Sequence, residues 1–273
     1  LSASETSVVV GGDTSTITAT LTDAIGNPMD AHQIDFSVTV GDGTVSPTND
    51  ATDDWGKAIT TFSSPTLAET NTVKGVMNTD AAVYATVDIE VTHGALARVE
   101  TTPVSTHAVV VGDVNIVAEL MDTYRNHIDA TDTTEVDFTA TGGSIGPRTL
   151  VSGNKIQMVY TTCDSIITHT ITATTATGGY TDSTDVTTYG AAPATMTFTA
   201  EAGSTVVVSD TTNPEVLSIA LFDEYDNPSA YSDYDASEMY EVIFTWSTGA
   251  GIVDPDTVPV NTDGEWTGNY KSS

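Results

Sequence analysis

The stretch "LTDAIGNP" at residues 21–28 ends a strand-like pattern of alternating apolar residues. It returns in altered form as "LMDTYRNH" at 120–127 and as "LFDEYDNP" at 221–228. The aspartate in third place recurs at steps of 99 and 101 residues. Because about one hundred residues is a common size for a small domain, this period indicates a tandem repeat of whole domains.

Apolar residues alternate with polar ones on both sides of the recurring loop, which is typical of strands that bury one face. The residues predicted to point inward before the loop are Ile17, Ala19 and Leu21, then Ile116, Ala118 and Leu120, then Leu217, Ile219 and Leu221. Those predicted to point inward after the loop are Ile34, Phe36, Val38 and Val40, then Val136, Phe138 and Ala140, then Val242, Phe244 and Trp246.

Each strand after the loop ends in a glycine-containing turn closed by proline, at Pro47, Pro147 and Pro255. Short strands with frequent turn signals favour an antiparallel β-sandwich. The pattern of "ASEMYEVIF" at 236–244 is also compatible with a helix, but this stretch lies where the other copies have a strand. We expect a strand there, with a helical turn before it.

The first copy carries further motif residues after its glycine-rich turn, namely Thr52, Asp53, Gly56, Lys57 and Ala58. The second copy keeps Asp122, Asn126, Phe138 and Pro147, but has "SGNKIQM" in place of the last element. The third keeps Asp223, Asn227, Pro228, Phe244 and Pro255, with "TDGEWTG" as a shortened version.

This pattern resembles the bacterial immunoglobulin-like repeats of the invasin and intimin type, called Big-1 domains. The resemblance implies an all-β chain of three tandem immunoglobulin-like β-sandwich domains in a rod, at 1–92, 93–189 and 190–273. The third domain is expected to lack its last strands, since it has no counterpart of "NTVKGVM" or "AVYATVDIEV". Either the chain continues or another molecule supplies a strand. The resemblance also implies extracellular display at the cell surface, without catalysis.

The chain is strongly acidic, with 38 Asp and Glu against 7 Lys and Arg and a formal net charge of −31. Such a surface disfavours nucleic acid as a partner. It suits a salty or divalent-rich medium, where ions screen or bridge the charges. No apolar run approaches the length of about 18 residues that a transmembrane helix needs. The lone cysteine, Cys163, is predicted to be a small buried thiol.

Enzyme signatures are not found in this sequence. The five histidines are scattered without zinc-ligand spacing, and there is no serine-nucleophile, phosphate-loop or dithiol motif. The histidines are His32, His93, His107, His127 and His169. We therefore predict that the chain is not an enzyme and expect no certain cofactor.

Calcium is the cofactor that remains open, because it prefers several carboxylate and carbonyl oxygens on a flexible loop. The alternative is that the carboxylates are simply solvated and keep the surface soluble. The candidate ligands are Asp53, Asp54, Asp223, Glu224, Asp226, Asp254 and Asp256, with Asp233 and Asp235 as a further cluster. The candidate contact residues for a partner are Tyr225, Tyr231 and Tyr234, in a tyrosine-rich acidic stretch where core packing is the alternative.

The recurring loop is predicted to be a corner and not a binding pocket. An aspartate can accept hydrogen bonds from loop amides, asparagine tolerates positive φ, and proline begins the next segment. Arg125 and His127 replace glycine and proline in the second copy. A corner tolerates such drift better than a ligand site does.

Three functions remain open on this basis. The first is a structural segment of a surface layer or similar array, which self-associates with neighbouring copies through bridging cations. The second is the stalk of a cell-surface adhesin whose binding tip lies outside the segment. The third is a filament subunit that takes a strand from its neighbour.

Overall fold

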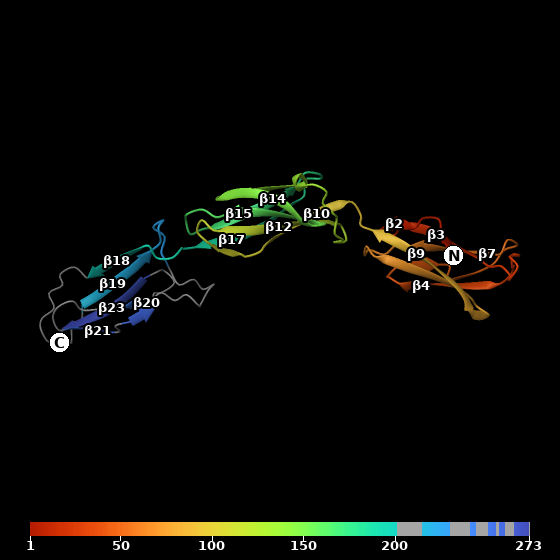
Figure 1. Cartoon of the computed structure of the whole chain (residues 1–273), viewed down its shortest axis with the longest axis horizontal. Coiled ribbons are helices and arrows are strands. Elements are labelled where there is room, and N and C mark those ends of the chain that lie inside the picture. Colours follow the sequence, from red (N-terminus) through yellow and green to blue (C-terminus); the bar gives the residue numbers. More distant parts are fainter. Residues whose placement is uncertain (201–214, 230–240, 244–250, 255–256, 260–264, 273) are drawn as a thin grey trace.

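The computed structural model describes residues 1–200, 215–229, 241–243, 251–254, 257–259 and 265–272. Strands dominate, and Figure 1 shows them gathered in three sets that follow one another from the N-terminus to the C-terminus. Each set takes up one consecutive part of the chain, so the repeat in the sequence is also a repeat in space. The fold is all-β, as the alternating pattern predicts.

The first set forms two sheets with the strand orders β1-β3-β7-β5 and β2-β9-β8-β4-β6. All pairs are antiparallel except β2 with β9, which run parallel. The strands are β1 (Ser2–Ala3), β2 (Ser7–Val9), β3 (Thr14–Thr20), β4 (Gln33–Val40), β5 (Thr44–Ser46), β6 (Asn49–Ala51), β7 (Lys57–Ser63), β8 (Thr70–Met77) and β9 (Asp80–Thr92).

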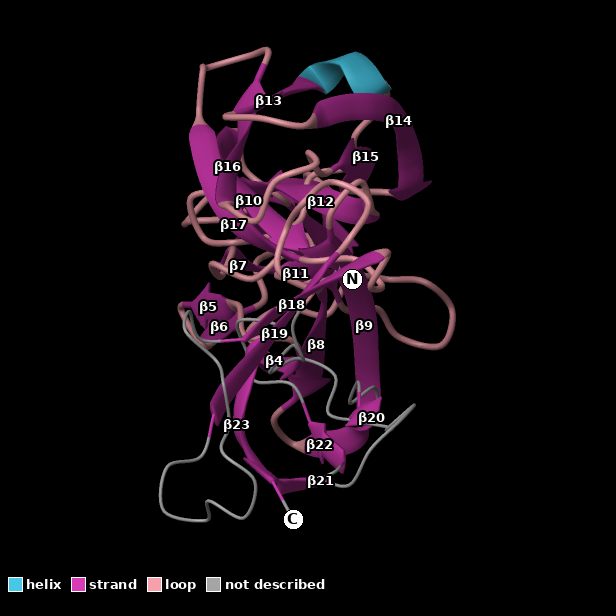
Figure 2. Ribbon diagram, turned by 90° about the vertical axis from the view of Figure 1, so that its left-hand side faces the viewer, coloured by secondary structure: helices cyan, strands magenta, loops and turns pink. Residues whose placement is uncertain are grey.

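The second set repeats this topology without a counterpart of β6, and its orders are β10-β12-β15-β14 and β11-β17-β16-β13. Its strands are β10 (Leu96–Pro103), β11 (His107–Val109), β12 (Asp113–Asp122), β13 (Val136–Ala140), β14 (Ser144–Ser152), β15 (Lys155–Thr161), β16 (Thr168–Thr175) and β17 (Thr181–Tyr189). One short 3-10 turn, η1 (Thr133–Glu135), precedes β13 and is the cyan element in Figure 2.

In the third set the described strands form the sheets β18-β19-β23-β21 and β20-β22. They are β18 (Thr195–Ala200), β19 (Glu215–Phe222), β20 (Glu241–Ile243), β21 (Gly251–Asp254), β22 (Thr257–Pro259) and β23 (Glu265–Ser272). By order and pairing, β23 is the counterpart of β7 and β15. The strand expected within 236–244 is β20, whereas the helical turn expected before it lies outside the described residues.

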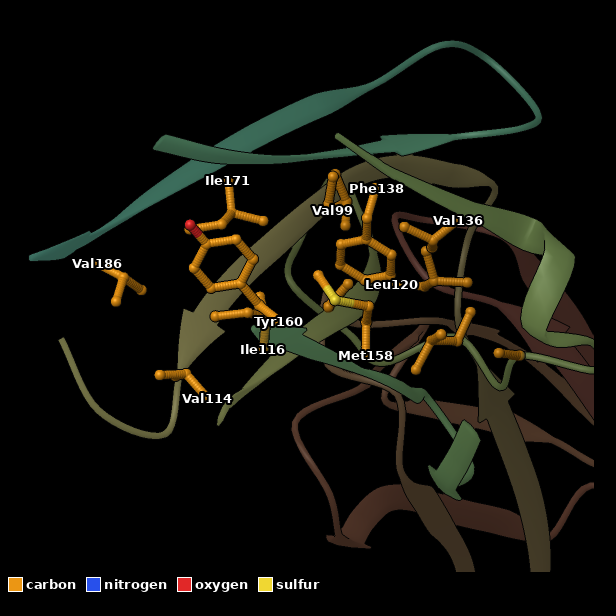
Figure 3. Packing of buried hydrophobic residues seen from close by; sticks show 14 of the residues in the cluster. Val99, Val114, Ile116, Leu120, Val136, Phe138, Met158, Tyr160, Ile171 and Val186 are labelled. Atoms are coloured by element: carbon orange, nitrogen blue, oxygen red, sulfur yellow. The ribbon is translucent and has the colours of Figure 1, made fainter. Parts of the chain in front are cut away.

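Each of the first two sets encloses its own apolar core between its sheets. The core of the second set is shown in Figure 3, where Tyr160, Met158 and Ile116 lie among aliphatic side chains. Tyr160 is fully buried, and its hydroxyl donates a hydrogen bond of 3.0 Å to the carbonyl of Gly142. Burying one large apolar side chain stabilises a fold by about 1.5–3 kcal/mol, so these residues anchor the sandwich.

Most residues predicted to point inward are buried, and Ile17, Ile116 and Ile219 are each at most 2% exposed. Val40 is an error of the prediction, because it is 56% exposed. The pairing of β4 with β8 shifts register between Val38 and Val40, so the simple alternation fails there. The side chains of Leu217, Val242, Phe244 and Trp246 lie outside what the structure describes.

Cys163 is half-buried and not buried as predicted. The strand β15 ends at Thr161, so Cys163 lies in the turn that leads to β16. There its Sγ is 3.0 Å from Nε2 of His169, which is buried. The alternation of the strand was wrongly extended into this turn.

Candidate functional site

The recurring loop is a corner built on its aspartate. In the second copy Oδ1 of Asp122 accepts hydrogen bonds from the amides of Tyr124, at 2.8 Å, and Asn126, at 2.9 Å. The first and third copies have the same pair of bonds, with lengths between 2.8 and 3.0 Å. The residue before the asparagine has positive φ in every copy: Gly26 at 92°, Arg125 at 71° and Asp226 at 65°.

The loop has a second role, because Asn126 bridges to the preceding sandwich. Its Oδ1 accepts a hydrogen bond of 2.8 Å from the amide of Ala68. Its Nδ2 donates one of 2.8 Å to the carbonyl of Thr66 and another of 2.9 Å to Oδ2 of Asp122. Asn126 is only 6% exposed, so these bonds are shielded from water. One side chain thus joins the turn after β7 to the corner after β12.

The aspartate also holds the linker between the sandwiches. Oδ2 of Asp122 accepts a hydrogen bond of 2.8 Å from the amide of Gly94, which lies between β9 and β10. The carboxylate of Asp122 is fully buried and accepts bonds from the loop, the asparagine and the linker together. We call this arrangement of aspartate, asparagine, linker amide and preceding turn the joint.

The second joint repeats two bonds of the first, from the linker amide to the aspartate and from the asparagine to the turn carbonyl. Oδ2 of Asp223 accepts a hydrogen bond of 3.0 Å from the amide of Ala191 in the linker, and Asp223 is 1% exposed. Nδ2 of Asn227 donates one of 2.6 Å to the carbonyl of Asp164 in the preceding turn. Ser229 adds a bond of 2.6 Å from its Oγ to the carbonyl of Ala191.

The carbonyls that accept from the two asparagines stand at corresponding positions. Thr66 and Asp164 each lie four residues after a core aromatic residue, Phe62 in the first sandwich and Tyr160 in the second. Because these acceptors are backbone atoms, both joints make the same asparagine-to-carbonyl bond although their turn sequences differ. The joint therefore depends on the shape of the turn and not on its side chains.

Hydrogen bonding keeps the joint aspartates ionised. Burial alone raises the pKa of Asp122, but bonds from Asn126, Gly94 and Tyr124 outweigh it and leave the pKa below its usual value. Burial likewise raises the pKa of Asp223, and hydrogen bonds, that from the Ala191 amide foremost, lower this pKa to below its usual value. Both carboxylates are thus negatively charged acceptors at neutral pH.

Tyr124 reaches from the first joint to the first sandwich. A Cβ added at Gly11 would lie 2.7 Å from the hydroxyl oxygen of Tyr124, so the ring packs directly on that glycine. Val111 stands at the corresponding place in the second sandwich and has a φ of 56°, which is unusual for a β-branched residue. The first joint therefore allows a closer approach at this point.

The structure describes some of the predicted metal ligands and not others. Oδ1 of Asp53 accepts bonds from the amides of Trp55, at 2.9 Å, and Lys57, at 2.8 Å, so Asp53 forms a similar corner. Asp54, Glu224 and Asp226 are exposed, whereas Asp223 belongs to the second joint. Asp254 lies in β21, and Asp256, Asp233 and Asp235 lie outside the described residues.

Within the described ranges there is no group of three or more His, Cys, Asp or Glu side chains that could hold a metal ion. Calcium binding by the candidate carboxylates stays a prediction. Of the candidate contact residues, Tyr225 is 39% exposed, and a hydrogen bond with Glu224 raises the pKa of its hydroxyl. Tyr231 and Tyr234 lie outside the part of the chain that the structure describes.

The prediction of a corner did not include its contact with the neighbouring sandwich. In the three copies, Asp and Asn stand at the same places while the residues between them change. Within the corner the asparagine also donates from Nδ2 to the aspartate in all three copies. The repetition is accounted for by this bond within the loop, so it did not by itself indicate the contact with the neighbouring sandwich.

A scan against protein-family models gives no match, and a search of curated protein sequences gives none either. Among the described residues no helix is long and apolar enough to cross a membrane. The comparison with solved structures does place the fold: the sandwiches are immunoglobulin-like β-sandwiches of the kind seen in bacterial adhesins.

The chain is similar to FdeC, an Escherichia coli adhesin, with a TM-score of 0.57 and 15% identity over 98% of this chain and 85% of that one. Invasin, a bacterial integrin-binding protein, aligns with a TM-score of 0.47 and 18% identity over 96% of this chain and 51% of its own. InvD of Yersinia pseudotuberculosis aligns with a TM-score of 0.48 and 18% identity over 99% and 81%.

Proposed function

We propose that this chain is a segment of a cell-surface stalk, built from immunoglobulin-like domains of the Big-1 type at 1–92, 93–189 and 190–273. The observation that carries the proposal is the repeated joint. Asp122 with Asn126 and Asp223 with Asn227 fasten successive sandwiches through the same set of atoms. A stalk needs such joints, because it must hold its tip at a distance from the surface.

The likeness of the fold to an adhesin from Escherichia coli supports this proposal. Extracellular display at the cell surface follows from it. The acidic surface suits exposure to an ionic medium, where salt screens repulsion between neighbouring modules. In this role the chain is a spacer and has no catalytic activity.

Small-angle scattering of the full chain tests whether the joints hold the rod. The N126A/N227A double variant removes both bridging amides and leaves the aspartate corners in place. We expect the wild-type chain to scatter as one extended particle and the double variant to show a broader distribution of lengths. Equal scattering by both proteins would contradict the role of the joints. Asp53→Ala, which removes a corner without a bridge, is the matched control.

The alternatives of a surface-layer array and a strand-exchanging filament rest on net charge and sequence pattern alone. Sedimentation of the chain with calcium and with a chelator distinguishes an array former from a stalk. A stalk segment stays monomeric in both conditions, whereas an array former associates when calcium is added. A rise of the melting temperature in calcium by more than a degree or so would support a structural metal site.

A further inference from the structure

A polar pocket of about 420 Å³ lies where the two sheets of the second sandwich meet. It is lined by residues 98–102 of β10, by Thr181 and Asp182 at the start of β17, and by Arg125 from the corner of the first joint. Strands β10 and β17 belong to different sheets and pack along one another here. The volume is in the range of small-molecule sites, which is about 300–1,000 Å³. One sandwich thus forms a pocket that is large enough for a small ligand.

The pocket contains an unusual share of the few cations of this chain. The sequence has three arginines, and two of them, Arg98 and Arg125, line the pocket. Nη1 of Arg98 lies 3.4 Å from Oε1 of Glu100, and Nη2 of Arg125 pairs with the same oxygen. A guanidinium group has five N–H donors. Within the described part of the chain each of these arginines uses its side chain for this one contact. Most of their donors are therefore available to a ligand.

Thr101 and Asp182 add polar groups that are only partly satisfied. Oδ2 of Asp182 accepts a hydrogen bond of 2.7 Å from the amide of Thr101. The hydroxyl oxygen of Thr101 is buried, and it is the only buried side-chain nitrogen or oxygen of the described residues that lacks a hydrogen-bond partner. Such atoms are rare in folded proteins because they cost stability. Thr101 lines the pocket, so a turn about its Cα–Cβ bond can present the hydroxyl to a ligand oxygen.

The charges of the lining favour an uncharged ligand. Two arginines stand against Glu100 and Asp182, so the formal charges of the pocket cancel. An anion would have to compete with Glu100 for both guanidinium groups, in a chain with a net charge of −31. A hydroxyl group both donates and accepts hydrogen bonds, so neighbouring hydroxyls can bond to guanidinium, carboxylate and threonine groups together. An uncharged ligand with several hydroxyl groups fits this lining.

We propose that this pocket binds an uncharged sugar unit. Arg98 and Arg125 donate hydrogen bonds to its oxygens, the carboxylate of Asp182 accepts one from a hydroxyl, and the hydroxyl of Thr101 gains its missing partner. This role goes beyond that of a spacer, because it puts a glycan contact on the side of the second sandwich, next to the first joint. Among the described residues that line the pocket there is no aromatic ring. Binding of a single sugar should thus be weak, with a dissociation constant on the order of millimolar.

An NMR titration of the full chain with D-glucose, D-galactose and D-mannose tests this proposal. We expect at least one of these sugars to shift the amide signals of Thr101 and Asp182 in a saturable way, at concentrations up to about 50 mM. The three corresponding uronic acids test the argument from charge, and they should bind less tightly than the neutral sugars.

Thr101→Val is the most informative variant, because it removes the unpaired hydroxyl and keeps a side chain of similar shape. It should weaken binding of the sugar about 2- to 10-fold through the loss of one hydrogen bond, while the melting temperature stays equal or rises. If Thr101 had a structural role alone, only the melting temperature would change. Asp182→Asn should also weaken binding. Asp185→Asn is its matched control on the same strand, since Asp185 bonds to Thr170 outside the pocket.

Three results would overturn the proposal. The first is that none of the neutral sugars shifts the signals of Thr101 and Asp182. The second is tighter binding of the uronic acids than of the neutral sugars. The third is an equal affinity of the wild-type chain and Thr101→Val for the sugar.

Discussion

Asn126 is the residue that links the corner of one sandwich to the turn of another. Its side chain makes two hydrogen bonds across the joint and one within the loop. Each such bond contributes about 0.5–1.5 kcal/mol, and truncation also leaves a backbone donor and acceptor without their partner. Within the described part of the chain, the side chain of Asn27 makes only the bond within the loop.

We therefore predict that the loss of the contacts across the joint in Asn126→Ala lowers the free energy of unfolding by about 2–3 kcal/mol. Asn27→Ala in the same chain should cost less, on the order of 1 kcal/mol. Urea unfolding of both variants measures the difference. Equal costs would mean that the contacts with Thr66 and Ala68 contribute nothing to stability.

Val111 is held in a left-handed backbone conformation, where a β-branched side chain is strained. Glycine removes this strain of about 1–2 kcal/mol, although it also increases the entropy of the unfolded chain. We predict that Val111→Gly stabilises the second sandwich by up to about 1 kcal/mol. Calorimetry should show a higher melting temperature. As a control, Val109→Gly within β11 should lower it.

At the scale of the element, the loop and its strand were predictable in part. The alternation of apolar residues identified the strands before and after the corner, because the core of each sandwich buries one face of every strand. It failed at Val40, where a bulge breaks the register, and at Cys163, where the strand has ended. The joint was missed because its partners, Thr66 and Ala68, are about sixty residues away and contribute only backbone atoms.

The joint is also predicted to weaken in acid. The pKa of Asp122 is lower in the folded chain than in the unfolded chain, where the pKa of an aspartate is about 3.9. Its contribution to stability is thus fully present above about pH 4 and is lost as the pH falls through the folded pKa. The protection of the Gly94 amide, which is its exchange rate compared with the intrinsic rate at the same pH, should fall between about pH 5 and 2.

Asp122→Asn gives the matched comparison for this acid effect. An amide cannot accept hydrogen bonds at both of its polar atoms, so this variant loses bonds on one side of the joint at every pH. Gly94 should then exchange quickly at neutral pH, with little further change on acidification. If wild-type Gly94 showed no acid dependence of its own, the ionised carboxylate would not be what holds the linker.

At the scale of the whole molecule, the period in the sequence corresponds to the spacing of joints along the rod. The loop at 21–28 was predicted to be a corner, and the next two copies are corners that also fasten two sandwiches together. The charge of −31 adds repulsion along the chain, which short-range joints must withstand. Net charge could be read from composition, whereas the joints required the sandwiches to be placed in space.

Amide hydrogen exchange at the joints tests the central claim most directly. In the wild-type chain the amides of Ala68, Gly94 and Ala191 donate to the side chains of the joints. We predict that all three are protected relative to exposed loop amides. Asn126→Ala should release Ala68 and leave Ala191 protected. Exchange of all three at the rate of free loops in the wild-type chain would contradict the account.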